Sequence, residues 1–343
     1  MKTYKNLWDQ FISKENFELA TKKAVKSKKS KRETIRFLAK QDELIEQLRH
    51  DLMRNKFTTS KYNIFLVFEP KKREIFELPL YPDHIVHHAL INVLGPIWER
   101  RFIRDSYACI PGRGVHSAIK KTMQMIKKNK YVLQCDIRKF YPSINHEIMM
   151  NIIAKKIHDR KILQLLQKIV FSIDGGKNLP IGNLTSQWMG NLYMTEFDLF
   201  VKHKLKCKDY VRYSDDFCLF HNDKRVLNQY AQKISEFLEN NLQLKLSRAV
   251  LKPSKGLNFI GYRLFGDFIL LRRRTVRNIK RRIMRIVAKK SKSKYVVSSL
   301  AATRGAMMWA NSYNLEKQII ASINPKKDKK MLRFVQKRLL NKK

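Results

Sequence analysis

Apolar positions recur at helical spacing near both ends of the chain. Within residues 3–55 the apolar side chains are spaced for one buried helix face, and they are Leu38, Leu44, Ile45, Leu48 and Leu52. Residues 272–294 hold 12 Lys or Arg in 23 positions and no acid, with Ile279, Ile283, Ile286 and Val287 on one side. The pattern therefore predicts helices at the start of the chain and a basic amphipathic helix near its end.

Between these regions the apolar runs are short and typical of strands. Tyr62–Phe68 and Glu74–Pro79 flank residues 69–73, which end in Lys71, Lys72 and Arg73. This predicts a β-hairpin with a basic tip. Tyr131–Ile137 is an apolar strand with Asp136 near its end. Tyr210–Phe220 has two β-prone runs around Ser214, Asp215 and Asp216, so it predicts a second hairpin with carboxylates at its tip.

An Asp at a turn is usually explained by the turn itself, because its side chain hydrogen-bonds nearby backbone. The second carboxylate, Asp136, changes this interpretation. If the strand that carries Asp136 and the hairpin that carries Asp215 belong to one sheet, their side chains form a cluster suited to hard cations such as Mg²⁺. Two metals so held favour in-line phosphoryl displacement.

The charge indicates a polyanionic partner. Among 343 residues, 72 are Lys or Arg and 29 are Asp or Glu, a formal net charge of +43, while 44% are hydrophobic. This excludes a wholly disordered basic tail. The charge is spread along the chain, which favours nucleic acid over a membrane surface. The run 22–32 is either an RNA contact or a solvated face.

The four cysteines have no close-paired spacing that suggests zinc, so we expect small buried side chains in a reducing compartment. A signal-peptide apolar region and an apolar run of membrane-spanning length are both lacking, so we expect a cytoplasmic protein without a membrane partner.

Two turns precede predicted helices. Gly112, Arg113 and Gly114 come before a helix to about Asn129, where backbone amides approach phosphates closely or simply turn the chain. Residues 179–187 contain Pro180 and Gly182 and open a long helix to about Leu205, with Thr185, Ser186 and Gln187 in its first turns.

The ordered set resembles reverse transcriptases: the basic hairpin, Gly-Arg-Gly, Asp136 with Phe140 and Tyr141, the turn at 181–187, and Tyr-Ser-Asp-Asp at 213–216. The resemblance covers about residues 60–312. Many members have Gln-Gly-x-x-x-Ser-Pro at the turn. The form found here, from Ile181-Gly182 to Ser186-Gln187, is similar to that of diversity-generating retroelements, within the group II intron-like enzymes of prokaryotes.

The resemblance implies an α+β, right-hand polymerase fold with fingers, a palm of antiparallel sheet plus helices, and a helical thumb. Residues 1–60 would form a basic helical extension, 61–265 the fingers and palm, and 266–343 the thumb.

The resemblance also implies roles for single residues. Asp136, Asp215 and Asp216 would be catalytic and, with the carbonyl of Ile137, would hold two Mg²⁺ ions, for which Mn²⁺ can substitute. The deoxynucleotide would contact Lys72, Arg73, Tyr141 and Gln187, with Tyr141 excluding a ribose 2′-hydroxyl. Arg113, Ile181 and Gly182 would act on the template and on fidelity.

Two positions depart from the family. Ser214 fills a position often occupied by a small or apolar residue, and the segment after the hairpin also differs. At 245–249, where a Lys is expected as proton donor to pyrophosphate, the chain has Arg248, whose high pKa makes it a poor acid. Lys245 is the alternative donor.

The implied function is RNA-directed DNA synthesis from a retroelement template RNA, error-prone at template adenines (mutagenic retrohoming). Its partners would be template RNA, the RNA/DNA duplex, dNTPs and a small, basic, oligomeric accessory variability protein. The alternatives are another bacterial reverse transcriptase (retron-like, CRISPR-associated or antiphage) and a non-catalytic RNA-binding scaffold.

Overall fold

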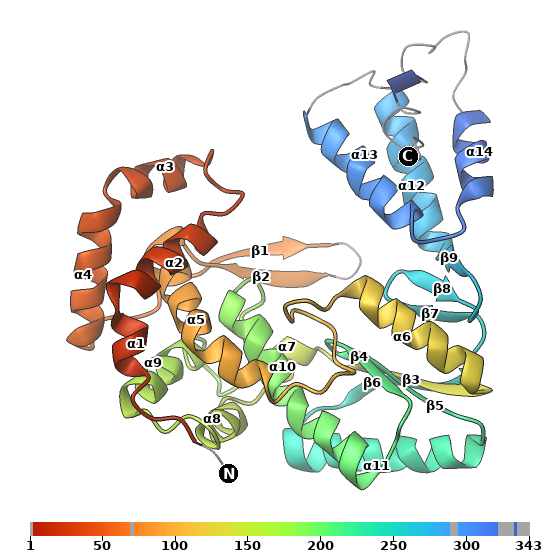
Figure 1. Ribbon diagram of the computed structural model, residues 1–343, viewed down its shortest axis with the longest axis horizontal. Helices are drawn as coiled ribbons and strands as arrows, with labels where there is room; N and C mark the ends of the chain where they lie inside the picture. The colour runs from red at the N-terminus through yellow and green to blue at the C-terminus, as the bar shows by residue number, and fades with distance from the viewer. Residues whose placement is uncertain (1–2, 69–71, 289–293, 322–332, 335–343) are drawn as a thin grey trace. The chain divides into compact units, whose positions relative to one another are not determined.

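The structure is a computed structural model that describes residues 3–68, 72–288, 294–321 and 333–334 (Figure 1). Glu69, Pro70 and Lys71, part of the predicted basic hairpin tip, lie outside the described residues. The chain divides into two compact units. The first comprises Met1–Gly112, Gln134–Phe217 and Gln229–Ala249, and the second comprises Arg113–Leu133, Cys218–Asn228 and Val250–Lys343.

The first unit contains most of the helices together with the predicted hairpin. Its helices are α1 (Trp8–Ile12), α2 (Lys14–Ala24), α3 (Arg32–Ala39), α4 (Gln41–Met53), α5 (Ile85–Glu99), α7 (Phe140–Ser143), α8 (His146–Ala154), α9 (Arg160–Val170) and α10 (Leu184–Leu199), with short helical turns η1 (Leu80–His84) and η2 (Phe200–Lys204). Strands β1 (Asn63–Val67) and β2 (Arg73–Glu77) pair antiparallel, which confirms the predicted hairpin.

The two carboxylate-bearing segments belong to one sheet of four strands in the order β4-β5-β3-β6. Its strands are β4 (Tyr210–Tyr213), β5 (Asp216–His221), β3 (Tyr131–Ile137) and β6 (Leu246–Pro253), and α11 (Lys224–Leu242) follows β5 in the chain. Together with the antiparallel strand pairs, this mixture of helices and sheet confirms the predicted α+β class.

Helix α10 is the most buried helix of the first unit. Twelve of its 16 residues are buried; most of them are apolar or small, and the polar exceptions are Asn191 and Asp198. A helix buried all round packs against several neighbours at once. Here Gly190 allows Phe140 and Tyr141 to approach, and Tyr193 donates a 2.7 Å hydrogen bond to the carbonyl of Leu242.

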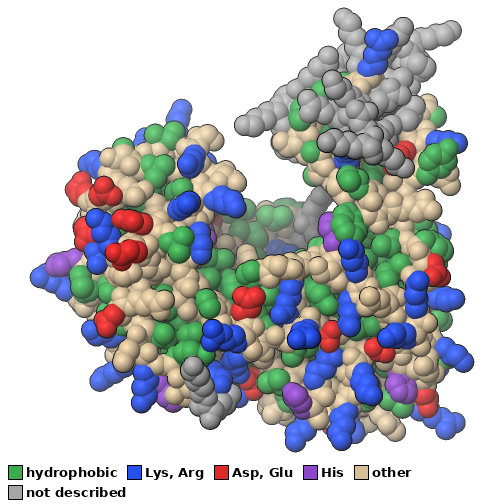
Figure 2. Space-filling model, in the orientation of Figure 1, with side chains coloured by type: hydrophobic (Ala, Val, Ile, Leu, Met, Phe, Trp, Pro, Cys, Tyr) green, Lys and Arg blue, Asp and Glu red, His purple; other side chains and the backbone are tan. Residues whose placement is uncertain are grey.

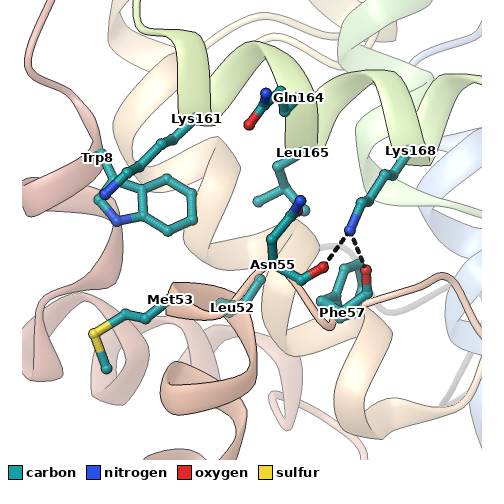
Figure 3. Close-up of a pocket in the computed structure, with 9 residues that line it drawn as sticks. All are labelled: Trp8, Leu52, Met53, Asn55, Phe57, Lys161, Gln164, Leu165 and Lys168. Carbon is teal, nitrogen blue, oxygen red and sulfur yellow. Dashed lines mark hydrogen bonds between the residues drawn. The ribbon is translucent and has the colours of Figure 1, made fainter.

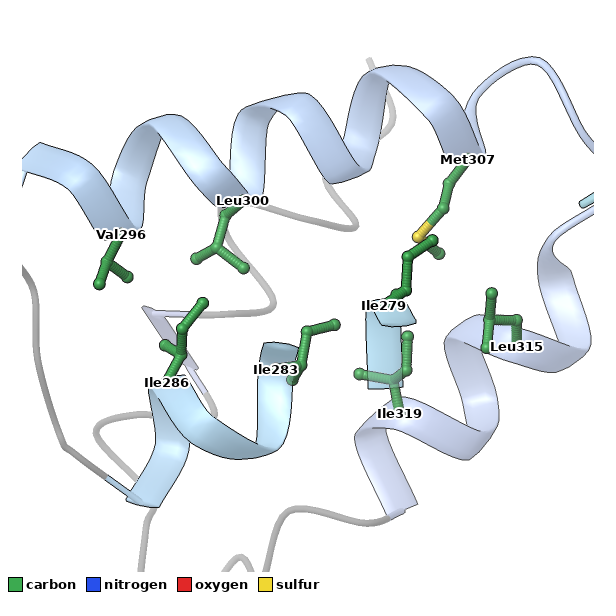
Figure 4. Packing of buried hydrophobic residues seen from close by; sticks show 8 residues of the cluster. All are labelled: Ile279, Ile283, Ile286, Val296, Leu300, Met307, Leu315 and Ile319. Atoms are coloured by element: carbon green, nitrogen blue, oxygen red, sulfur yellow. The ribbon is translucent and has the colours of Figure 1, made fainter. Parts of the chain in front are cut away.

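The second unit has its own small core. It contains α6 (Val115–Lys128), an antiparallel sheet of β7 (Leu257–Phe259), β8 (Tyr262–Leu264) and β9 (Ile269–Leu271), and the helices α12 (Arg273–Ala288), α13 (Lys294–Met307) and α14 (Tyr313–Ala321). Buried residues of the last three helices interdigitate (Figure 4), and they are Ile279, Ile283, Ile286, Val296, Leu300, Met307, Leu315 and Ile319. The amphipathic pattern predicted for α12 is therefore confirmed.

One detail of the helix pattern is wrong. The face predicted for residues 38–52 is interrupted at Lys40, whose φ of −128° ends α3, so Leu38 is 36% exposed while Ile45 and Leu48 are buried. In the part of the chain that is described, every helix is too short or too polar to cross a bilayer.

Candidate active site

Asp136 and Asp215 lie on neighbouring strands. Asp136 is the penultimate residue of β3, Asp215 lies in the turn between β4 and β5, and Asp216 begins β5. Because β5 and β3 are adjacent in the sheet, the strand end and the hairpin tip meet, as the sequence predicts.

The charge of Asp215 is influenced by two other site residues. Burial raises the pKa of Asp215, the negative charge of Asp136 raises it further, and the positive charge of Arg73 lowers it. All three side chains are therefore close enough to interact. The β1–β2 hairpin brings Arg73 near the carboxylates, where the cation can bind phosphate oxygens.

Asp136 is held by a residue that the sequence reading did not single out. The hydroxyl Oγ of Ser247 lies 2.8 Å from Oδ2 of Asp136 and 3.1 Å from its carbonyl oxygen. Next to it, the Arg138 amide donates a 2.8 Å hydrogen bond to the carbonyl of Lys245. The start of β6 is thus fastened to the end of β3 at the carboxylate. A polar residue two positions after Lys245 was the only sequence signal for this contact.

Tyr141 lies against both the β4–β5 hairpin and α10. Burial raises the pKa of its phenol to about 12, Asp215 adds to the shift, and a hydrogen bond with the Ser214 side chain opposes it. On the other side, a Cβ built on Gly190 would lie 3.2 Å from Cε1 of Tyr141. The absence of a side chain at position 190 therefore sets how closely the ring packs on the helix.

The turn before α10 is attached to the β1–β2 hairpin. The amide of Phe76 donates a 2.8 Å hydrogen bond to the carbonyl of Ile181. Gly182 has a φ of +126°, and a Cβ there would lie 2.9 Å from the Phe76 carbonyl oxygen. Only glycine combines this backbone conformation with so close an approach. Ile181 and Gly182 thus lie beside the same hairpin that carries Arg73.

The other predicted residues lie at or near the ends of helices and strands. Lys72 is exposed immediately before β2, Gln187 is exposed in the first turn of α10, and Ile137 is buried at the end of β3. Arg113 belongs to the second unit, directly after Gly112 with its φ of +70° and before α6. Lys245 and Arg248, the two proton-donor candidates, are both exposed.

Asp136 and Asp215 are the carboxylates that could hold a metal ion at this site. Within the described residues, no three His, Cys, Asp or Glu side chains gather in a way that could hold one metal ion. Mg²⁺ is usually held by only one or two carboxylates together with substrate phosphates and water. Asp136 and Asp215, two partly buried carboxylates that repel each other, fit that requirement, and a divalent cation would relieve their repulsion.

The sequence also gives no sign of a buried ion pair between strand β4 and helix α10. Arg212 and Asp198 are both fully buried and form an ion pair, with Nη2 of Arg212 2.6 Å from Oδ2 of Asp198. In a chain with so many basic residues, nothing in the sequence distinguishes Arg212 from the arginines that contact solvent.

A pocket away from these residues is too small to be the nucleotide site. It lies among α1, α4 and α9, with a volume of about 100 Å³ (Figure 3). Lys168 closes one side by donating hydrogen bonds of 2.7 Å and 2.9 Å to the carbonyls of Asn55 and Phe57. Ligand pockets usually measure about 300 Å³ or more.

Comparison with known proteins agrees with the site. The family model for reverse transcriptase (RNA-dependent DNA polymerase) matches residues 71–264, more than half of the chain. Protein YkfC of Escherichia coli K12 is 25% identical over 235 residues, which cover 54% of this chain and 62% of YkfC. The group II intron-encoded protein LtrA of Lactococcus lactis is 23% identical over 220 residues, covering 58% of this chain and 36% of LtrA.

The retron Ec73 reverse transcriptase of Escherichia coli is 25% identical over 192 residues, covering 50% of this chain and 59% of that protein. The chain spans less than two thirds of the length of each of these relatives. The matched segment includes both Asp136 and Asp215 together with the hairpin residue Arg73. The chain belongs to the reverse transcriptase family.

Proposed function

We propose that the protein is an RNA-directed DNA polymerase that copies a retroelement template RNA into cDNA. The observation that carries the proposal is the meeting of Asp136 and Asp215 on adjacent strands, with Arg73 close enough to affect the charge of Asp215. Carboxylates and a cation in this arrangement suit nucleotidyl transfer.

Asp136, Asp215 and the carbonyl of Ile137 would hold two Mg²⁺ ions, with Asp216 as a further ligand or support. Bound divalent cations would activate the attacking 3′-oxygen and stabilise the leaving pyrophosphate. Arg73 and Lys72 bind the triphosphate of the incoming deoxynucleotide. Tyr141 lies beside Asp215 and blocks a 2′-hydroxyl, while Gln187 contacts the nascent base pair.

The basic surface supports binding of template RNA and of the RNA/DNA duplex. Lys and Arg side chains are scattered across the visible face, and several of the visible acids gather over the region of α3 and α4 (Figure 2). Helix α12 buries its isoleucines and so directs its many Lys and Arg residues away from the core. Such a face grips phosphates with an affinity that falls as salt rises.

We place the enzyme among diversity-generating retroelements because of the turn at 181–187. Ile181 and Gly182 pack on the fingers hairpin, so an altered turn acts on the pocket for the new base pair and relaxes fidelity at template adenines. The proposal includes Arg113 on the template, a small basic oligomeric accessory protein as partner and a cytoplasmic location. Residues 1–60 form the basic extension, 61–265 the fingers and palm, and 266–343 the thumb.

The similarity to a retron reverse transcriptase favours a second candidate, a retron-like bacterial enzyme with the same chemistry. Primer extension on a defined RNA template, with Mg²⁺ and four dNTPs, separates the possibilities. DNA product with errors concentrated opposite adenine supports the diversity-generating role, and faithful product moves the enzyme to the retron-like, CRISPR-associated or antiphage role. RNA binding without any product, with cognate RNA and accessory protein present, would contradict polymerase function and leave a scaffold.

A further inference from the structure

Arg212 occupies an unusual position for an arginine in so basic a protein. Its side chain is 0% exposed, as is that of Asp198, and the two form a hydrogen-bonded ion pair with distances of 2.8 Å (Nε to Oδ1) and 2.6 Å (Nη2 to Oδ2). Replacing a buried ion pair with apolar residues is often neutral or stabilising, so the pair by itself is weak evidence of a stabilising role. Its other contacts indicate a different task.

The guanidinium group bonds along two edges. One edge forms the fork to Asp198, which lies near the end of α10. On the other edge, Nη1 donates to the carbonyl of Ser214 at 3.0 Å and to Oδ1 of Asn191, also on α10, at 3.2 Å. Arg212 therefore links the most buried helix of the unit to the turn of the β4–β5 hairpin.

The acceptor at Ser214 belongs to the peptide group that precedes Asp215. Ser214 has a φ of +58°, in the left-handed region that side chains other than glycine rarely adopt. A non-glycine residue stays in that conformation only where its surroundings hold it. By fixing the Ser214 carbonyl, Arg212 fixes the peptide plane from which the Asp215 side chain projects.

The backbone of Arg212 is held by two hydrogen bonds of its own. Its amide donates a 2.9 Å hydrogen bond to the carbonyl of Asp105, and its carbonyl accepts a 3.0 Å bond from the amide of Tyr107. Hydrogen bonds of both its backbone and its guanidinium group thus fix the position of Arg212.

We propose that Arg212, anchored by Asp198, is a positioning residue that sets the orientation of the Asp215 carboxylate for binding of the catalytic cation. The inference rests on the proposed function and adds to it. A planar fork is required, because one guanidinium must bond Asp198 and Ser214 in fixed directions. The ammonium of a lysine keeps the charge and cannot reproduce both edges.

The test compares Arg212→Lys with Tyr210→Phe. Tyr210 is the matched control because its hydroxyl, also buried, donates to the same Oδ1 of Asp198 at 2.7 Å, whereas the Ser214 carbonyl accepts from Arg212. Two quantities are measured: kcat and dNTP KM in primer extension per folded molecule, and the affinity for Mn²⁺ by electron paramagnetic resonance without substrate. Melting temperatures report stability separately.

We expect Arg212→Lys to lose about 10- to 100-fold in kcat and about 10-fold in Mn²⁺ affinity, with dNTP KM little changed. Tyr210→Phe should melt lower and change kcat and Mn²⁺ affinity less than 3-fold. If Arg212→Lys does not fold, Asn191→Ala replaces it. It removes the second acceptor of Nη1 and also the 2.7 Å hydrogen bond that Nδ2 of Asn191 donates to the carbonyl of Ala108, whose effect on stability the melting temperature reports. Its expected loss is about 5-fold in kcat and in Mn²⁺ affinity.

Equal kcat and equal Mn²⁺ affinity in the Arg212→Lys, or Asn191→Ala, and Tyr210→Phe proteins would overturn the positioning role. A wild type that makes no DNA, yet binds Mn²⁺ more tightly than Arg212→Lys, would overturn the polymerase function and keep the positioning role. The two failures are therefore distinguishable.

Discussion

Ser247 and Asp136 are joined by a hydrogen bond of 2.8 Å between the serine hydroxyl and Oδ2 of the carboxylate. The bond restricts the rotation of one of the two carboxylates that meet at the strand ends. Partners of this kind orient metal ligands, and their loss typically reduces metal affinity or activity by about 10- to 100-fold. We expect Ser247→Ala to lower polymerase activity by about 10-fold and to raise the Mg²⁺ concentration needed for half-maximal rate.

The control for this change is Ser247→Thr, which keeps a hydroxyl at the same position. It should retain most of the activity and the wild-type Mg²⁺ requirement. Because Ser247 is exposed, the melting temperature should change little in either variant. An Ala variant with unchanged Mg²⁺ dependence would mean that the bond has no role in holding Asp136.

A second prediction concerns the contact between Gly190 and Tyr141. In Gly190→Ala the new Cβ lies 3.2 Å from Cε1 of Tyr141 and 3.3 Å from Cε1 of Phe140, so the ring moves by a few tenths of an ångström. A displaced ring fits the deoxyribose less well, and we expect kcat/KM for dNTPs to fall about 5-fold. Single-nucleotide incorporation measures it.

Gly95→Ala is the matched control for Gly190→Ala. Gly95 also lies within a helix, and its Cβ would crowd an aromatic ring at a similar distance, 3.3 Å from Cη2 of Trp188. It should melt like Gly190→Ala and keep normal dNTP kinetics. The same kinetic loss in both variants would show that helix crowding, and not Tyr141, causes the effect.

A third prediction concerns Gly182, in the turn that packs on the β1–β2 hairpin. Gly182→Ala meets the Phe76 carbonyl at 2.9 Å with a φ of +126°, so the turn must shift away from β2. We expect a loss of about 2–4 kcal/mol in unfolding free energy, measured by urea denaturation, and a changed error rate in the cDNA.

The control, Gly175→Ala, has a similarly positive φ of +98° and no atom within 4 Å of the new Cβ. It carries the backbone strain without the contact and should lose about 1 kcal/mol. Equal losses of stability and equal error rates in the two variants would show that packing on Phe76 is unimportant.

The sequence predicts those parts of the site that depend on local pattern. The hairpin at Asp215, the strand ending at Asp136 and the buried face of α12 each follow from the spacing of apolar residues, and the structure confirms all three. The break at Lys40 was missed because periodicity continues across it, although the backbone turns there.

The contacts between segments could not be predicted in the same way. Asp198 and Arg212 are 14 residues apart and become an ion pair only when the end of α10 packs against β4. Ser247 is 111 residues from Asp136 and meets it only because β6 lies beside β3. Such partners depend on the tertiary arrangement, and a basic or polar side chain read alone is as consistent with a solvated surface.

Asp215 is proposed to support nucleotide transfer, and incorporation of a single dNTP opposite an RNA template measures this role. Wild type, Asp215→Asn and Asp174→Asn are compared with Mg²⁺ present and after its removal by chelation. Asp174 is the control because it is an exposed carboxylate in a loop. We predict incorporation by wild type and Asp174→Asn only with Mg²⁺, and a loss of at least about 1,000-fold in Asp215→Asn. Equal incorporation by the wild type and Asp215→Asn proteins would contradict this role of Asp215.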